Sequence, residues 1–150
     1  MSDDYEIVPV SKNDYQDVIR VWEDSVRATH DFLSDDDIEF LKPLILNEYL
    51  DAVTLAGVKD DAGMVIGFLG VAEGNIEMLF VDPKHRGKSV GSKLLEYAVN
   101  SLKATKVDVN EQNGQAVGFY KHRGFNVIGR SPLDGQGKPF PLLHMTLRGN

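Results

Sequence analysis

Apolar residues recur at helical spacing in the first part of the chain and predict a helix that runs to about Ala28. The positions that form this stripe are Tyr15, Val18, Ile19, Trp22 and Val26. Ser11, followed three residues later by Asp14, has the form of a capping pair at the start of the helix. A weak alternation over residues 5–10 predicts a strand before it.

A second helix is predicted to begin at Ser34, because three aspartates follow at residues 35–37, where the positive end of the helix dipole favours carboxylates. Its apolar positions are Ile38, Leu41, Leu44, Ile45, Tyr49 and Leu50. Pro43 falls inside this pattern, so we expect a kink or a break near Lys42.

From residue 52 onward the hydrophobic period becomes that of strands. Segments 52–58 and 64–72 flank a short glycine-bearing loop at 60–63, which suits a hairpin. A second turn at 74–75 leads into segment 76–81. The sequence therefore predicts three antiparallel strands.

The remaining chain alternates between helical and strand patterns. A helix is predicted from near Val90, a strand at 106–109, a helix at 113–122 that Gly124 ends, and strands at 125–130 and 142–147. The order is β-α-α-β-β-β-α-β-α-β-β in one domain spanning residues 1–150. We expect an α/β or α+β fold with a mixed, mostly antiparallel sheet and helices on both faces.

Composition narrows the class of protein. The chain has 150 residues, 42% of them hydrophobic and 26% charged, which suits a single domain with a packed core. It has no cysteine, so disulfides, thiolate metal sites and a cysteine nucleophile are excluded. The formal charge of −7 and the lack of a basic stripe argue against nucleic-acid binding. Without a long apolar run or a signal-like N-terminus, we expect a cytoplasmic protein without membrane contact.

One turn carries the clearest chemistry. In "VDPKHRGKSVGSKLLEYAV", residues 81–99, a strand leads into a helix through a basic, glycine-containing turn. Unpaired N–H groups at a helix N-terminus bind anions, and glycines permit close approach of backbone to an oxygen. Arg86 and Lys88 would add charge, and Ser89 and Ser92 would add hydroxyl donors. A pyrophosphate fits best, although the same letters also suit a plain tight turn.

Two better-known phosphate motifs do not fit. The letters "GKS" at 87–89 resemble the end of a P-loop, but that motif needs glycine where Asp82 stands. The dinucleotide fingerprint G-x-G-x-x-G is also unmatched.

Two segments together resemble a known family. "MLFVDPKHRGKSVGSKLLEYA" resembles the central motif of the GNAT superfamily of acetyl-coenzyme A-dependent N-acetyltransferases, and "NEQNGQAVGFYKHRGF" resembles its next motif. Segments "ATHDFL" and "GRSPLDGQGKPFPLLHM" further resemble a small bacterial subgroup with uncharacterised acceptors. One position departs from the family pattern, because Ser89 stands where the first glycine of G-x-G is expected; its N–H can still face an anion.

The resemblance implies transfer of an acetyl group from a thioester to an amine. Tyr120 is the expected general acid, because a phenol stays protonated at neutral pH and can donate to a departing thiolate. Glu77 is the candidate base, directly or through water, and alternation places it on one strand face with Leu79 and Val81. The alternatives are a core tyrosine beside Phe119 and an ion-paired or edge-facing glutamate.

The resemblance also implies the acetyl-coenzyme A site. The N–H near Leu79 would polarise the acetyl carbonyl, the pyrophosphate would lie across residues 86–92, and Asn113 would bond the pantetheine arm. The expected coenzyme-binding residues are Leu79, Phe80, Val81, Arg86, Gly87, Lys88, Ser89, Val90, Gly91, Ser92, Asn113 and Phe119.

The acceptor side is predicted less sharply. His30 and Phe32 lie between the first two helices, the region that covers the acceptor in proteins of this resemblance, and His144 is a weaker candidate. His85 is interpreted as a solvated turn residue. No histidine pair has metal-ligand spacing with carboxylates, so no metal is expected.

The sequence leaves two classes of function open. The first is an N-acetyltransferase acting on a primary amine of a small molecule, peptide or protein, by direct attack in a ternary complex because no cysteine can carry the acetyl group. The second is a non-catalytic acyl-coenzyme A sensor or other phosphate-binding regulatory module. A monomer or a homodimer is expected, since the edge strand "LLHMTL" could pair between subunits.

Overall fold

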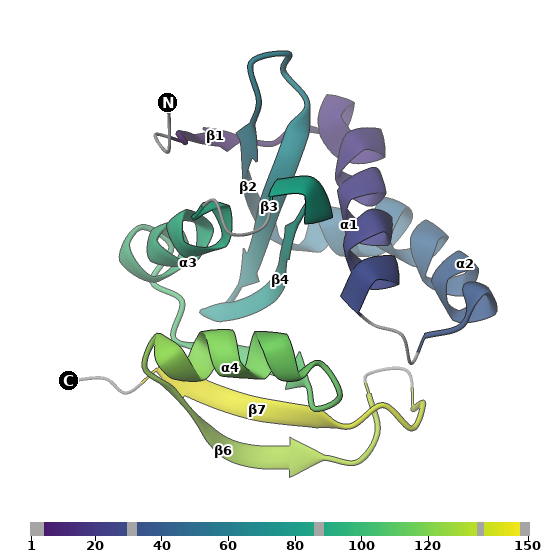
Figure 1. The fold of residues 1–150 in the computed structure, drawn as a ribbon, viewed down its shortest axis with the longest axis vertical. Helices are drawn as coiled ribbons and strands as arrows, with labels where there is room; N and C mark the ends of the chain where they lie inside the picture. The colour runs from purple at the N-terminus through teal and green to yellow at the C-terminus, as the bar shows by residue number, and fades with distance from the viewer. Residues whose placement is uncertain (1–4, 30–32, 86–88, 135–136, 148–150) are drawn as a thin grey trace.

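The computed structural model describes residues 5–29, 33–85, 89–134 and 137–147 (Figure 1). Its strands are β1 (Ile7–Pro9), β2 (Thr54–Lys59), β3 (Val65–Ala72), β4 (Asn75–Val81), β5 (Lys106–Asn110), β6 (Phe125–Ser131) and β7 (Leu142–Leu147). Its α-helices are α1 (Tyr15–Thr29), α2 (Asp35–Leu44), α3 (Val90–Asn100) and α4 (Gly114–His122). The predicted order of helices and strands is confirmed. Among the described residues, no helix is long and apolar enough to cross a membrane.

The strands form one sheet in the order β1-β2-β3-β4-β5-β7-β6. Every neighbouring pair is antiparallel except β4 and β5, which are parallel. That parallel pair is registered only at Asn75 with Lys106 and Ile76 with Val107. Beyond these residues the two strands part, and the sheet opens in its middle.

Two hydrophobic cores cover the two faces of the sheet. Leu94, Leu95 and Tyr120 belong to the core that packs under α3 and α4, together with Val107 and Met145 from the strands. The second core lies under α1 and α2. Its buried side chains include Val18, Trp22, Ile38, Phe68 and Met78. The predicted mixed sheet with helices on both faces is therefore confirmed.

Strand β4 carries a bulge at Glu77. Gly70 pairs with Met78 and Val71 pairs with Ile76, so Glu77 has no residue opposite it on β3. Ile76 consequently packs in the α3–α4 core, whereas Met78 packs in the α1–α2 core. The predicted alternation of Leu79 and Val81 against Met78 and Phe80 is confirmed beyond the bulge. An extra residue of this kind re-aims side chains and is frequent next to active sites.

The predicted helix starts are confirmed by their caps. Ser11 with Asp14 forms a capping box at the short helix η1 (Lys12–Asp14), which leads into α1. Ser34 with Asp37 forms another at α2. In both boxes the aspartate carboxylate accepts a hydrogen bond from the backbone N–H of the serine.

The break expected near Lys42 was predicted in the wrong place. Helix α2 continues through Pro43 to Leu44 and passes directly into η2 (Ile45–Tyr49), a π-helical segment. Proline removes the N–H that would bond the carbonyl four residues earlier. The chain accommodates that loss by a wider turn after Pro43, so the helical path is kept.

Candidate active site

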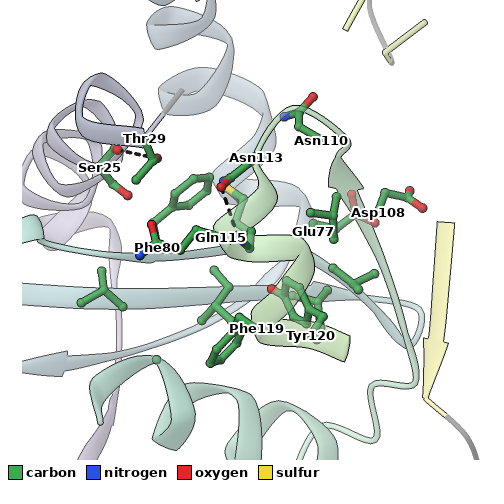
Figure 2. A pocket seen from close by; sticks show the side chains of 18 of the residues that line it. Ser25, Thr29, Glu77, Phe80, Asp108, Asn110, Asn113, Gln115, Phe119 and Tyr120 are labelled. Carbon is green, nitrogen blue, oxygen red and sulfur yellow. Dashed lines mark hydrogen bonds between the residues drawn. The ribbon is translucent and has the colours of Figure 1, made fainter. Parts of the chain in front are cut away.

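A cleft of about 980 Å³ lies where β4 and β5 part (Figure 2). Residues from both faces of the sheet line it, so the cleft extends from one face to the other. On the α1 side the lining includes Ser25, Thr29 and Tyr49, and on the α3–α4 side it includes Ser89, Gly91, Phe119 and Tyr120. Glu77 to Val81 of β4 and Val107 to Asn110 of β5 line the middle.

Tyr120 is both a core residue and a wall of the cleft. Its side chain is 6% exposed, and its ring meets the rings of Phe119 and Phe125 edge-on at centroid distances of 5.2 and 5.5 Å. Burial raises the pKa of the Tyr120 hydroxyl well above its ordinary value. The phenol therefore stays protonated at any working pH and is available as a proton donor.

The described part of the predicted anion turn begins at Ser89, the N-cap of α3. Ser89 adopts a left-handed conformation, with φ 69° and ψ 9°, which glycine adopts more readily than serine. Residues 89 to 92 line the cleft. Arg86, Gly87 and Lys88, also predicted to bind the coenzyme, lie outside the described residues.

Gly91 leaves space in the first turn of α3. A Cβ added there would lie 3.7 Å from Val81 and 3.8 Å from Phe119, both of which line the cleft. These are ordinary contact distances, so alanine would fit. A larger side chain would extend from this point toward the space between β4 and α4.

Arg123 is a cleft residue that the sequence interpretation missed. Its guanidinium group donates a hydrogen bond to the Ser92 hydroxyl and lies 4.7 Å from the centroid of the Phe119 ring. It thereby joins the start of α3 to the end of α4 and adds a cation to the wall that carries the anion turn. Only the fold brings it there, since 31 residues separate Arg123 from Ser92.

Glu77 is exposed and lines the cleft at the bulge of β4. Its carboxylate accepts a hydrogen bond of 2.8 Å from the Asn75 side chain, and it forms no ion pair among the described residues. The geometry therefore leaves a solvated carboxylate at the point where the two strands separate.

The other predicted coenzyme residues also line the cleft. Leu79, Phe80 and Val81 form one wall beyond the bulge, where the β5 side of β4 has no registered strand partner among the described residues. Asn113 is the N-cap of α4, and its side-chain oxygen accepts a hydrogen bond of 3.2 Å from the Ala116 N–H.

Of the predicted acceptor residues, only His144 can be placed. His30 and Phe32 lie outside the described residues. His144 on β7 lies beside Asp108, with its Nδ1 atom 2.7 Å from the Asp108 Oδ1 atom, and Asp108 lines the cleft. Asp108 was not singled out in the sequence, although the alternation of β5 exposes it between the buried residues Val107 and Val109.

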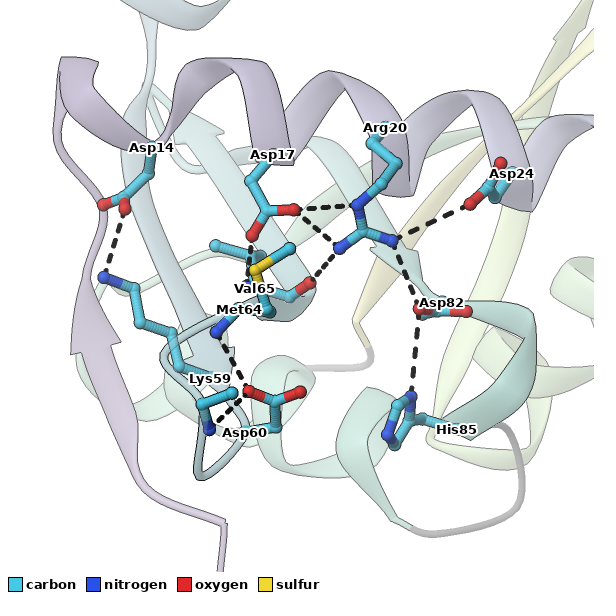
Figure 3. A network of polar contacts seen from close by, with 11 residues as sticks. Asp14, Asp17, Arg20, Asp24, Lys59, Asp60, Met64, Val65, Asp82 and His85 are labelled. Carbon is cyan, nitrogen blue, oxygen red and sulfur yellow. Dashed lines mark hydrogen bonds and ion pairs between the residues drawn. The ribbon is translucent and has the colours of Figure 1, made fainter.

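The interpretation of His85 as a solvated turn residue is wrong. His85 lines the cleft, and its Nδ1 atom is buried with no hydrogen-bond partner among the described residues, 3.9 Å from the Asp82 carboxylate. The cause is a polar network between α1 and the end of β4 (Figure 3). Asp82 is 6% exposed and meets Arg20 at 3.4 Å, while Arg20 also bonds Asp17 and the Val65 carbonyl.

Comparison with known proteins places this geometry in a family. Residues 33–148 match the acetyltransferase (GNAT) domain. The peptidyl-lysine N-acetyltransferase YjaB of Salmonella typhimurium is 41% identical over 128 residues, covering 85% of this chain and 88% of that protein. The protein of the same name from Escherichia coli is 40% identical over 134 residues, covering 89% and 90%.

Solved structures of acetyltransferases have the same fold as this chain. The solution structure of the apo form of Escherichia coli YjaB has a TM-score of 0.86 at 37% identity, covering 97% of this chain and 99% of that one. A PaiA N-acetyltransferase from Thermoplasma acidophilum, solved in complex with coenzyme A, has a TM-score of 0.72 at 24% identity, with coverage of 98% and 99%, which supports the fold. The non-catalytic alternative is not favoured by relatives that are named as enzymes. The chain belongs to the GNAT acetyltransferase family and is an acyltransferase enzyme.

Proposed function

We propose that the protein transfers an acetyl group from acetyl-coenzyme A to the ε-amine of lysine side chains in peptides or proteins. The observation that carries the proposal is the cleft at the opening between β4 and β5, which is lined from both faces of the sheet. A thioester held on the α3–α4 side and an amine arriving from the α1 side can meet there. The lysine acceptor is suggested by relatives named as peptidyl-lysine N-acetyltransferases.

The α3–α4 side suits a coenzyme. Backbone N–H groups at the start of α3 and the guanidinium of Arg123 favour a pyrophosphate, and Gly91 leaves room beside them. The apolar wall formed by Val81 and Phe119 suits the pantetheine arm. We therefore propose that residues 86–92 and Asn113 bind the coenzyme.

The chemistry needs proton transfers at both the amine nitrogen and the thioester sulfur. As the amine nitrogen bonds to the acetyl carbon, the carbon–sulfur bond breaks, and the Tyr120 hydroxyl donates its proton to the departing sulfur. Enclosure by Phe119 and Phe125 keeps that proton on Tyr120 until it is needed. A lysine that arrives as the ammonium first passes one proton to Glu77, directly or through water, so that its nitrogen can attack. The excess proton left on nitrogen after attack is lost to water as the amide forms.

Attack is proposed to be direct, in a ternary complex. The chain has no cysteine that could hold the acetyl group, and the lining of the cleft from both faces of the sheet would let the two reactants enter from opposite sides. A cytoplasmic location and a monomeric or homodimeric state stay predictions from the sequence. The expectation that "LLHMTL" is an edge strand open to a second subunit is wrong, because β7 lies between β5 and β6.

The test is an acceptor comparison with acetyl-coenzyme A as donor. One peptide has a blocked N-terminus and a single lysine, a second replaces that lysine by arginine and frees its α-amine, and a small diamine is the third acceptor. The proposal predicts that the first peptide gains one acetyl group by mass spectrometry and is preferred over the other two acceptors. Acetylation of the α-amine or the diamine alone would contradict the lysine assignment.

A further inference from the structure

Three polar side chains form a hydrogen-bonded row across three adjacent strands of the sheet. Asp108 lies on β5, His144 on β7 and Ser131 on the outer strand β6. The His144 Nδ1 atom is 2.7 Å from the Asp108 Oδ1 atom, and its Nε2 atom is 2.6 Å from the Ser131 hydroxyl. The row leads from the outer edge of the described sheet to the cleft, which Asp108 lines.

The row lies on the sheet face that turns away from α4. Val107, Val109 and Met145 alternate with its members and are buried in the core under α3 and α4. Asp108 and His144 therefore point to the face from which the acceptor is proposed to arrive. By alternation Lys106, at the start of β5, is the other charged residue on this face of the three strands.

The Asp108 carboxylate decides which atom donates in its hydrogen bond with His144. A carboxylate only accepts hydrogen bonds, so the His144 Nδ1 atom donates to Asp108, and the Nε2 atom shares a second hydrogen bond with the Ser131 hydroxyl. Both ring nitrogens are then occupied, and the imidazole holds the Asp108 carboxylate in one orientation. The second oxygen of that carboxylate is left for a ligand in the cleft.

The same three residue types form the nucleophilic triad of hydrolases, in which serine is the reacting group. Their placement here indicates that Asp108, at the other end of the row from the serine, is the residue that meets a ligand. Ser131 lies on the outer strand, at the end of the row away from the cleft, while Asp108 reaches the cleft. The Asp108 side chain is also 44% exposed, whereas the aspartate of a hydrolase triad is buried.

We propose that Asp108 is the residue that selects a positively charged amine as acceptor, with His144 and Ser131 as positioning residues. The inference rests on the proposed acetyl transfer to lysine and adds the group that recognises the lysine ammonium. Asp108 on β5 and Glu77 on β4 then flank the opening, so the carboxylate that binds the ammonium is distinct from the proposed base.

The test compares two acceptors that differ in charge. One is a lysyl peptide, and the other is the same peptide with an aminooxy group in place of the ε-amine, which is neutral at neutral pH. Asp108→Asn is expected to lower kcat/KM for the lysyl peptide by about tenfold, mainly through KM, because a hydrogen bond between charged partners is lost. The value for the aminooxy peptide should stay within about twofold.

His144→Gln and Ser131→Ala should act in the same direction with smaller effects, and Asp108→Glu should recover part of the preference. Glu111→Gln serves as the matched control, because it removes a carboxylate just after β5 that is paired with Arg130 outside the cleft. The control should leave the ratio between the two acceptors unchanged.

Each outcome decides between the assignments. Equal losses for both acceptors in Asp108→Asn, or no loss for either, would overturn the role of Asp108 while acetyl transfer itself stands. Loss of all activity in Ser131→Ala would overturn it in favour of a serine nucleophile. A wild-type enzyme that acetylates neither acceptor would contradict the proposed function, and the assignment of Asp108 with it.

Discussion

At the scale of single residues, surroundings decide what a side chain can do. Tyr120 combines two interpretations that the sequence set against each other, because it is packed in the core and also faces the cleft. Its apolar surroundings raise its pKa, which suits a group that donates a proton and does not lose it to solvent.

Removing the Tyr120 hydroxyl should separate chemistry from binding. Tyr120→Phe is expected to lower kcat by about a hundredfold or more, because general acid catalysis is lost while the ring still fills its place. Isothermal titration should find acetyl-coenzyme A affinity within about twofold of wild type. Tyr97→Phe is the control, because Tyr97 packs against the same core from α3. Unchanged turnover in Tyr120→Phe would remove Tyr120 from the mechanism.

Ser89 carries backbone strain at the start of α3. Ser89→Gly is expected to stabilise the protein by about 1 kcal/mol, because glycine adopts the left-handed conformation without the steric penalty of a Cβ. Urea unfolding monitored by circular dichroism measures the difference. Ser101→Gly at the other end of α3 should bring no gain, since Ser101 has a right-handed conformation. A less stable Ser89→Gly variant would contradict the assignment of strain.

At the scale of elements, the periodic patterns predicted helices and strands well because apolar stripes and capping pairs act locally. Ser34 and Asp37 show this, since one box of four residues fixes where α2 begins. The bulge at Glu77 could not be predicted in this way, because its letters continue a regular alternation and the extra residue appears only against β3. The π-helical segment after Pro43 was missed for a similar reason, since neighbouring elements keep the helical path intact.

The Ser34–Asp37 box predicts an acid dependence of stability. The Ser34 backbone N–H donates to the Asp37 carboxylate and lowers its pKa. Burial opposes this shift, and Lys138 of the β6–β7 loop adds to the lowering. A lowered folded-state pKa contributes stability above the unfolded value of 3.8, and this contribution is lost as the pH falls below it.

Asp37→Asn should therefore be less stable than wild type at neutral pH, and the difference should shrink as the pH falls below about 4. Urea midpoints measured across the acid range test this. Asp36→Asn, in the same first turn, should bring a smaller change, since Asp36 is not the capping residue of the box. A difference that stays constant down to the lowest pH would contradict the role of the Asp37 charge.

At the scale of the whole molecule, function depends on two strands that pair briefly and then separate. From the sequence, the residues of the turn before α3 predicted an anion site, and the family resemblance added Tyr120 and Glu77 as candidate acid and base. It could not supply Arg123 or Asp108, because their partners Ser92 and His144 lie 31 and 36 residues away and meet only in the folded sheet. The opening between β4 and β5 likewise follows from long-range pairing, which no local pattern encodes.

Acetyl-coenzyme A is proposed to bind in the opening between β4 and β5. Calorimetric titration of wild type, Gly91→Ala and Gly91→Phe with acetyl-coenzyme A tests this proposal most directly. A Cβ added at Gly91 would lie at ordinary contact distance from Val81 and Phe119, so alanine fits, whereas phenylalanine would fill the space beside these two residues. We predict binding at about micromolar affinity for wild type and Gly91→Ala, and none for Gly91→Phe at an unchanged melting temperature. Equal binding by all three proteins would place the coenzyme elsewhere and contradict the account.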